Sequence, residues 1–247
     1  MRTLWLMYKT EAKLSIREFS SVLFGVLVPV GLIILLGILF GDSVLAETDT
    51  VRQIDVSFGA VCTLGICSAG LMGIPIALSD YRWRKILKRY KVTPISPMTL
   101  LMSHVLFCFS LSIVSTVLVY IISAVMFGFT LKGSVLVFIG VYLLVMVSIH
   151  SIGMVVASLA PNAQMAGVIA SIIYFPMVFL SGATIPYEIM PKALQTVSDF
   201  MPLTQGIKLL KTVSLGLPLT DVLFSFIVMA VVAIVCIVIS AKFFRWE

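Results

Sequence analysis

Six long runs of apolar residues dominate the sequence, and shorter polar segments separate them. Each run approaches the roughly 20 apolar residues that an α-helix needs to cross the hydrocarbon core of a bilayer. The pattern predicts an all-α membrane protein with six transmembrane helices, built as a single transmembrane domain over 1–247. The predicted spans cover about 22–40, 56–78, 100–127, 134–159, 165–180 and 222–241.

The first 21 residues have a different pattern, because apolar and basic side chains recur there at helical spacing. Leu4, Met7 and Tyr8 fall on one face of a helix, and lysines fall on another. We predict an N-terminal interfacial helix over 1–21 at the cytoplasmic membrane surface, as a passive anchor or as a functional element. The segment lacks the apolar core and cleavage site of a secretory signal, so the first span is expected to be retained.

The stretch between the fifth and sixth spans does not have the pattern of a simple loop. Prolines interrupt it, and two short amphipathic patterns lie between them. Pro191 suits the first turn of a helix that reaches about Phe200, and Pro202 stops that helix. We predict short re-entrant or interfacial helices at the outer face, with an external loop carrying two surface helices as the alternative. The residues assigned to this outer re-entrant segment are Ser181, Gly182, Pro186, Pro191 and Pro202.

Composition places most of the chain in lipid. Of the 247 residues, 60% are hydrophobic and 11% are charged, whereas soluble domains carry roughly 25% charged residues. The net charge of +6 does not indicate nucleic-acid binding, because the charges cluster in short segments between the apolar runs. The four cysteines lie within apolar runs and lack metal-ligand spacing, so we interpret them as buried hydrophobes and predict no metal site.

The distribution of lysine and arginine predicts the orientation of the spans. If both termini lie on one side of the membrane, twelve of the 17 lysines and arginines fall on that side. Cytoplasmic segments of membrane proteins carry the excess of these residues. We therefore expect a multi-pass protein of the cell membrane with both termini in the cytoplasm.

The sequence contains no recognisable energy source. It has no phosphate-cradling G-x-x-x-x-G-K-[ST] loop and none of the hydrolase patterns G-x-S-x-G or H-E-x-x-H. No Asp, Glu, Lys or Arg lies mid-span, where ion-coupled transporters place ionisable groups. His150 is the central candidate, but a lone histidine is more typical of packing than of a proton relay; His104 lies near the inner end of the third span. We expect that this chain is not an enzyme and that another chain supplies the energy.

The densest run of positive charge, at 80–97, lies between the second and third spans. It is either a loop that fixes orientation or a docking surface for a cytosolic partner. Four apolar side chains recur there at the spacing of one helical face: Trp83, Ile86, Leu87 and Tyr90. A purely orienting loop does not need such a face, so we predict a coupling helix over 81–91 that contacts the cytosolic partner supplying the energy. Its residues are Tyr81, Arg82, Trp83, Arg84, Lys85, Ile86, Leu87, Lys88, Arg89 and Tyr90.

Three further motifs are KVTPISP at 91–97, FLSGATIP at 179–186 followed by Met190 and Pro191, and MPLTQG at 201–206. They resemble motifs of the membrane permease subunits of type-2 ATP-binding-cassette (ABC) exporters, a class that includes drug-resistance and antibiotic-resistance permeases and polysaccharide exporters. The resemblance covers nearly the whole chain. The stretch at 83–88 departs from the Gly-Thr-Leu-Glu-like sequence of many members.

The resemblance implies a dimer of two copies, or of this chain and a homologous permease, in a bacterial membrane. ABC ATPase subunits would bind ATP and Mg²⁺ beneath it, so no cofactor is expected in this chain. The translocation path is expected at the dimer interface, lined by the second and fifth spans. A path free of charge suits a hydrophobic or amphipathic substrate, such as a drug, a peptide antibiotic or a lipid-like molecule. The residues chosen for this path are Gly70, Gly73, Tyr174 and Phe175.

Two other functions remain open at this point. One is an ion-coupled secondary transporter that uses His150, and full activity of a His150→Ala variant would argue against it. The other is a membrane scaffold or immunity protein that sequesters a toxin without transporting it. Protection that persists after inactivation of the partner's ATPase would favour this second alternative.

Overall fold

The computed structural model describes residues 2–17, 22–40, 52–86, 88, 96–182 and 191–243. Within these ranges, six helices are long and apolar enough to cross a membrane, which confirms the predicted all-α, six-span class. Some predicted positions lie outside the described residues, namely Leu87, Arg89, Tyr90, Pro186 and most of the KVTPISP motif.

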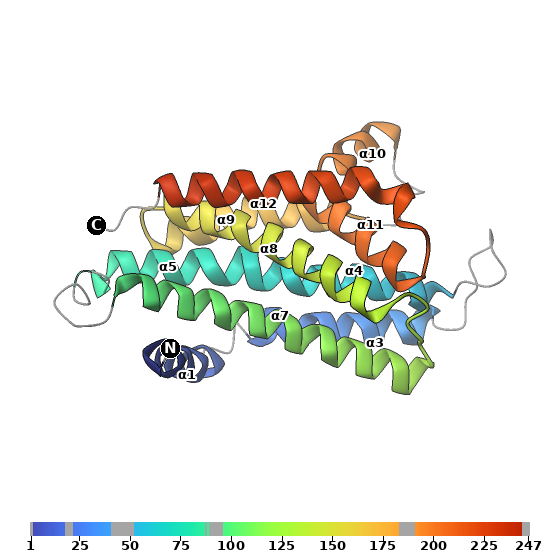
Figure 1. The fold of residues 1–247 in the computed structure, drawn as a ribbon, viewed down its shortest axis with the longest axis horizontal. Helices are drawn as coiled ribbons and strands as arrows, with labels where there is room; N and C mark the ends of the chain where they lie inside the picture. Colours follow the sequence, from blue (N-terminus) through green and yellow to red (C-terminus); the bar gives the residue numbers. More distant parts are fainter. Residues whose placement is uncertain are drawn as a thin grey trace.

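The spans follow one another along the chain and lie side by side along the long axis of the bundle (Figure 1). The first is η1 (Leu23–Leu27) with α3 (Val28–Phe40), and the second is α4 (Gln53–Cys67), η2 (Ser68–Gly73) and α5 (Ile74–Trp83). The remaining four are α7 (Pro97–Phe127), α8 (Val135–Leu159), α9 (Ala163–Leu180), and η4 (Leu219–Val222) with α12 (Leu223–Phe243). Among the described residues, three further helices do not span: α1 (Arg2–Arg17), α10 (Lys192–Asp199) and α11 (Pro202–Ser214).

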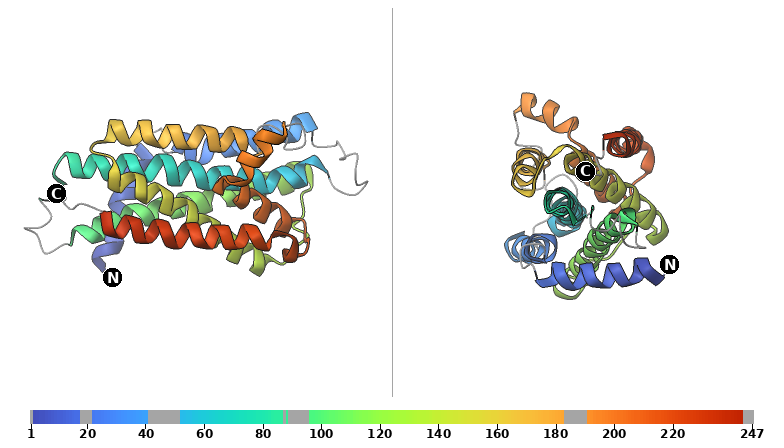
Figure 2. Two further views of the ribbon diagram at one scale, coloured as in Figure 1. Left: turned by 90° about the horizontal axis from the view of Figure 1, so that it is seen from above. Right: turned by 90° about the vertical axis from the view of Figure 1, so that its left-hand side faces the viewer.

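The second span forms the centre of the bundle, as the end-on view shows (Figure 2). In its most apolar window 78% of the residues are buried, against 17% in the fifth span and 22% in the sixth. Its three segments pack against α3, α7, α8, α9 and α11. The small residues of this span make that position possible, because they let neighbouring backbones approach closely. At Gly59, for example, an added Cβ would lie 2.7 Å from the backbone nitrogen of Lys211 in α11.

Two spans contain a wider, π-helical stretch just before a proline. In the first span η1 precedes Pro29, and in the second span η2 precedes Pro75. Proline has no N–H to donate and its ring clashes with the carbonyl group four residues earlier. A wider turn before the proline relieves this clash, so both helices continue past it.

Helix α1 lies across one end of the bundle, nearly at right angles to the spans (Figure 2). It begins at Arg2 and ends at Arg17, within the predicted interfacial segment. Its inner face packs against α7. On this face Met7 and Tyr8 contact the neighbouring apolar cluster, and Glu11 is buried. Trp5 and Leu6 are exposed, and the ring of Trp5 stacks on that of Tyr8 with centroids 5.5 Å apart. The C-terminal end of α12 lies at this same end of the bundle (Figure 1).

Helix α11 is buried in the bundle at the opposite end. It packs against α4, α8 and α12, and Leu203, Leu209 and Leu210 are fully buried. The alternative of two surface helices is therefore wrong for α11, whereas α10 keeps exposed apolar side chains. Pro191 immediately precedes α10, and Pro202 begins α11. Both prolines thus mark helix starts, because their missing N–H groups are not needed in a first turn.

The second span extends beyond its predicted limits at both ends. It begins at Gln53, so Asp55, which the sequence pattern placed in the outer loop, lies in its first turn and is buried. One carboxylate oxygen of Asp55 is 3.6 Å from the guanidinium of Arg52, and the other is 3.5 Å from the ammonium of Lys132. These two cations, together with the N-terminal end of a helix, stabilise a carboxylate at this depth.

Candidate functional site

The predicted coupling segment begins inside the second span. Helix α5 includes Tyr81, Arg82 and Trp83 and ends there, and Arg84 and Lys85 form a turn. Lys85 has a φ of 55°, in the left-handed region that ends a right-handed helix. A single unbroken helix over 81–91 is therefore wrong at Arg84 and Lys85, whereas Leu87 and the stretch 89–91 lie outside the described residues.

The side chains around this turn divide into exposed and packed groups. Trp83 is 65% exposed, and Lys85 and Lys88 are also exposed. Arg84 is exposed and pairs with Asp80 at 2.8 Å, one helical turn before it. Two other residues are tied to the bundle: Arg82 donates a hydrogen bond to the carbonyl of Ser158 at 3.3 Å, and Ile86 packs on the apolar cluster around Leu78 and Leu100.

A buried polar cluster connects this segment to α1 and α7. The hydroxyl of Tyr81 donates to Oε2 of Glu11 at 2.5 Å, and Nδ1 of His104 lies 3.2 Å from the same oxygen. Glu11 and His104 are each only 4% exposed. On the other side of the imidazole, Nε2 lies 3.6 Å from the thiol of Cys108. Because a carboxylate oxygen only accepts, the contact between Nδ1 of His104 and Glu11 requires a proton on Nδ1, which donates to Glu11.

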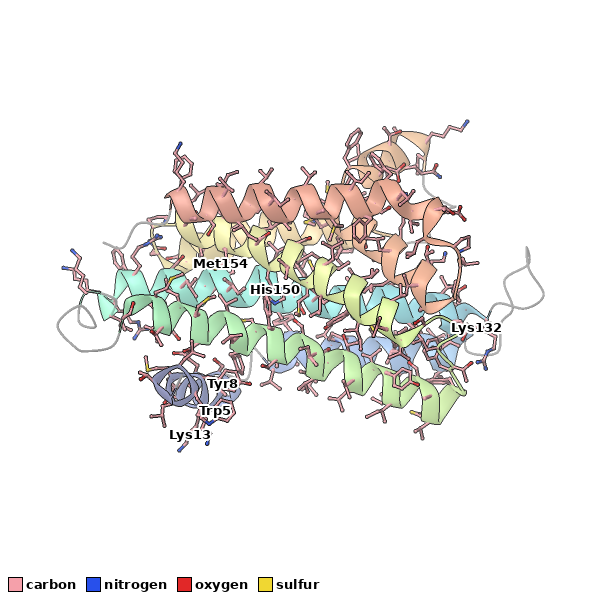
Figure 3. All side chains as sticks on the ribbon, viewed as in Figure 1. Trp5, Tyr8, Lys13, Lys132, His150 and Met154 are labelled. Carbon is pink, nitrogen blue, oxygen red and sulfur yellow. The ribbon has the colours of Figure 1, made fainter. Side chains whose placement is uncertain are left out.

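The sequence reasoning did not select Glu11, although its signal was present. Glu11 follows Met7 by four positions and Tyr8 by three, so helical spacing places it on the bundle-facing side of α1. The structure puts Tyr8 on that side as well, and its hydroxyl donates to Ser110 in α7 at 2.9 Å (Figure 3). Helix α1 is therefore held to the third span and, through Glu11, to the last turn of the second.

Gly70 and Gly73, two residues predicted to line a substrate path, lie in contacts between helices. Gly70 is buried, and an added Cβ would come within 3.1 Å of the imidazole of His150 in α8. At Gly73 the nearest atom is the sulfur of Cys108 in α7, 3.4 Å away. The small residues of the second span thus serve packing within the chain. Gly70 was predicted to line a path at the interface between two permease subunits, but the structure buries it against α8.

The other two predicted path residues lie on α9, the least buried span. Tyr174 is half-buried against the core, and Phe175 is 51% exposed. Their rings meet edge to face, with centroids 5.6 Å apart. Helix α9 also packs against α5, so the second and fifth spans are neighbours, as the predicted path requires.

His150 lies near the middle of the bundle (Figure 3). It is buried, its Nδ1 donates to the carbonyl of Met146 at 2.8 Å, and its ring meets Phe109 edge to face at 4.7 Å. A proton relay needs a chain of ionisable groups at membrane depth. The described partners of His150 are a backbone carbonyl, an aromatic ring and a glycine, which fits a packing residue.

The outer segment is held by hydrogen bonds to the end of α9. Ser181 is buried and donates to the carbonyl of Val178 at 2.8 Å. Gly182 follows with a φ of 82°, a conformation that favours glycine. Ser198 in α10 donates to the carbonyl of Leu180 at 2.5 Å, which connects α10 to the fifth span.

The profile of a family described as "ABC-2 type transporter" matches residues 2–215. The chain belongs to the ABC-2 type transporter family. It is also similar to Nodulation protein J of Rhizobium leguminosarum bv. viciae, with 32% identity over 124 residues, which cover 50% of this chain and 48% of the relative. Nodulation protein J of R. leguminosarum bv. trifolii is 36% identical over 95 residues, and that of Rhizobium meliloti (strain 1021) is 34% identical over 95 residues. Each of these two alignments covers 38% of this chain and 36% of the relative.

The chain thus spans about half the length of the first of these curated relatives and about a third of the length of the other two. The ABC-2 match itself is longer, since it runs from α1 through α11 and ends at Leu215, before the sixth span. ABC-2 membrane subunits are not themselves ATPases, and they normally work with an ATPase subunit in a membrane. Together with the six apolar helices, this makes the chain a multi-pass, transport-related membrane subunit.

Proposed function

We propose that this chain is the permease subunit of an ATP-driven exporter, coupled to a separate ATPase subunit and paired with a second permease. The path would carry a hydrophobic or amphipathic substrate. ATP and Mg²⁺ would bind to the partner ATPase and not to this chain. We place both termini in the cytoplasm of a bacterial cell, because the positively charged segments gather on the side of α1 and the C-terminal end of α12.

One observation carries the proposal: the most buried span ends in an exposed cluster of positive charge. The segments α4, η2 and α5 pack against α3, α7, α8, α9 and α11, and the turn that follows exposes Trp83, Arg84 and Lys85. A partner that pushes on this turn acts directly on the central helix. Movement of that helix in turn displaces the helices packed against it, since close-packed interiors transmit displacement.

The polar cluster of Glu11 supports this coupling role. Tyr81 lies in the last turn of α5 and donates to Glu11 of α1, which also contacts His104 of α7. A displacement of the turn after Trp83 is therefore shared by three helices at the same end of the bundle. Breaking such buried charged contacts one at a time is costly, so the three helices are expected to move together.

The surface chemistry supports a path between two permease subunits. Helix α9 exposes Phe175, Ile172 and Phe179, and the printed sequence of α9 contains no charged residue. Helices α3 and α12 also expose mainly apolar side chains. Such surfaces accept lipid, a second copy of the chain or an apolar substrate equally well. With Gly70 and Gly73 in contacts between helices, we assign the path to the exposed part of the fifth span at Phe175 and the adjacent Tyr174.

Purification from native membranes in mild detergent tests the proposal. We expect an ATP-binding subunit to copurify, and we expect ATP to drive substrate uptake into inside-out vesicles. Arg84→Glu reverses an exposed charge at the turn and should weaken the association, whereas Lys192→Glu, an exposed residue of α10 at the other end, should not. Transport without any ATPase subunit, which stops only when the proton gradient is removed, would refute the proposal.

A further inference from the structure

A cleft of about 830 Å³ opens at the end of the bundle that we place in the cytoplasm. The end of α5 and the turn after it form one wall, and the C-terminal ends of α8 and α12 form the others. Three cationic side chains line the cleft, namely Arg82, Lys85 and Lys88. Three large apolar side chains line it as well, namely Trp83, Leu159 and Phe243.

The cleft is strongly positive. No acidic side chain is among its described lining residues, and the nearby carboxylate of Asp80 pairs with Arg84, which is not one of them. Arg82 is oriented by its hydrogen bond to the carbonyl of Ser158, so its charge is held in the wall of the cleft. Three cations around one concave site favour an anionic ligand, and a phosphate group offers several oxygen acceptors to them.

The apolar side chains place this cleft at the boundary between hydrocarbon and headgroups. Leu159 is the last residue of the fourth span, and Phe243 is the last residue of α12. Leu159 is 61% exposed and Trp83 is 65% exposed, so the chain itself leaves most of both side chains uncovered. Tryptophan is enriched at this depth because one part of its ring is apolar and its N–H is polar.

We infer that this cleft binds the phosphate headgroup of an anionic phospholipid, with the acyl chains against Leu159, Phe243 and Trp83. Basic sites between transmembrane helices on the cytoplasmic side bind such headgroups. A soluble phosphate would meet the cations but would leave the apolar side chains uncovered. An acidic segment of a protein would likewise meet the cations but would leave Leu159 and Phe243 uncovered. The inference does not depend on the coupling role of the segment, because it rests on the shape and chemistry of the cleft.

Fluorescence quenching of Trp83 tests this site. The sequence has three tryptophans, so Trp5→Phe and Trp246→Phe leave Trp83 as the reporter. The full chain is reconstituted in nanodiscs of phosphatidylcholine with increasing fractions of phosphatidylglycerol. In one series phosphatidylglycerol carries brominated acyl chains, and in a second series phosphatidylcholine carries them. We expect brominated phosphatidylglycerol to quench Trp83 at a lower mole fraction than brominated phosphatidylcholine. The double variant Lys85→Gln/Lys88→Gln should lower this preference by about tenfold or more.

A matched variant separates the cleft from general surface charge. Lys9→Gln/Lys13→Gln removes two exposed cations from α1 on the same side of the bundle and should leave the preference unchanged. Lys85→Arg/Lys88→Arg keeps both charges and should preserve the preference. The loss in the glutamine variant would then come from the missing charges and not from misfolding. Equal quenching by the two lipids, or an equal effect of the α1 variant, would overturn the inference. Loss of the preference on adding inorganic phosphate at constant ionic strength would assign the site to a soluble anion and would also overturn it.

Discussion

The carboxylate of Glu11 lies 3.2 Å from Nδ1 of His104, although 93 residues separate them in the chain. Both side chains are buried, and the hydroxyl of Tyr81 completes the cluster. A carboxylate in such a place is costly unless donors surround it. The interfacial helix is thus held to the bundle by a specific polar contact in addition to its apolar face.

Replacing Glu11 with alanine should loosen α1. The variant leaves the hydroxyl of Tyr81 and Nδ1 of His104 without their acceptor, which costs about 1–3 kcal/mol. We expect a lower thermal unfolding midpoint in detergent and faster hydrogen exchange of the amides of α1. Lys13→Ala, an exposed change on the same helix, is the control and should have little effect. Identical midpoints for the two variants would mean that the cluster does not hold α1.

Two glycine-to-alanine changes should have opposite effects on stability. At Gly59 the new Cβ would come within 2.7–2.9 Å of the backbone of α11, and a backbone cannot move aside without displacing its helix. We expect a loss of about 1–3 kcal/mol, as for other overpacked cores. At Gly140 nothing lies within 4 Å, so alanine should gain up to about 1 kcal/mol through its better helix propensity. Denaturant or thermal unfolding measures both, and a stabilised Gly59→Ala variant would contradict the packing of α4 on α11.

Asp55 and Asp80 both accept ion pairs, but only Asp55 is buried. Asp55→Asn removes a charge that faces Arg52 and Lys132, so two ion pairs are lost at the outer end of the second span. We expect a loss of about 1–3 kcal/mol. Asp80→Asn removes an exposed pair between residues one helical turn apart and should cost about 0.5 kcal/mol or less. Comparing the two unfolding midpoints tests the depth of Asp55, and equal losses would argue against its burial.

Transport should not depend on His150 as a proton carrier. Its described contacts are those of a packed ring, so His150→Gln should keep ATP-driven transport while lowering stability. In vesicles supplied with ATP, an uncoupler that removes the proton gradient should leave the wild-type rate unchanged. A rate that falls with the gradient in the wild type but not in the variant would instead assign ion coupling to this residue.

Much of the architecture could be predicted because membrane spans are a local property of the chain. Each span depends on the summed hydropathy of neighbouring residues, so the six runs were found with their ends mostly within a few residues. Pro191 marked the start of α10 for an equally local reason, since it lacks an N–H, whereas Pro202 was predicted only as a stop and is the first residue of α11. The cluster of cations near Lys85 was visible in the same way.

The sequence alone therefore determined the class, the number of spans and the positively charged segment after the second span. The tertiary structure decided which span lies at the centre, that Gly70 packs on His150, that Glu11 meets Tyr81 and His104, and that the helix ends at Trp83. The physical reason is that burial and pairing depend on which helices are neighbours. Hydropathy and helical spacing describe one helix at a time, whereas a buried carboxylate or a close backbone contact exists only where two or three helices meet.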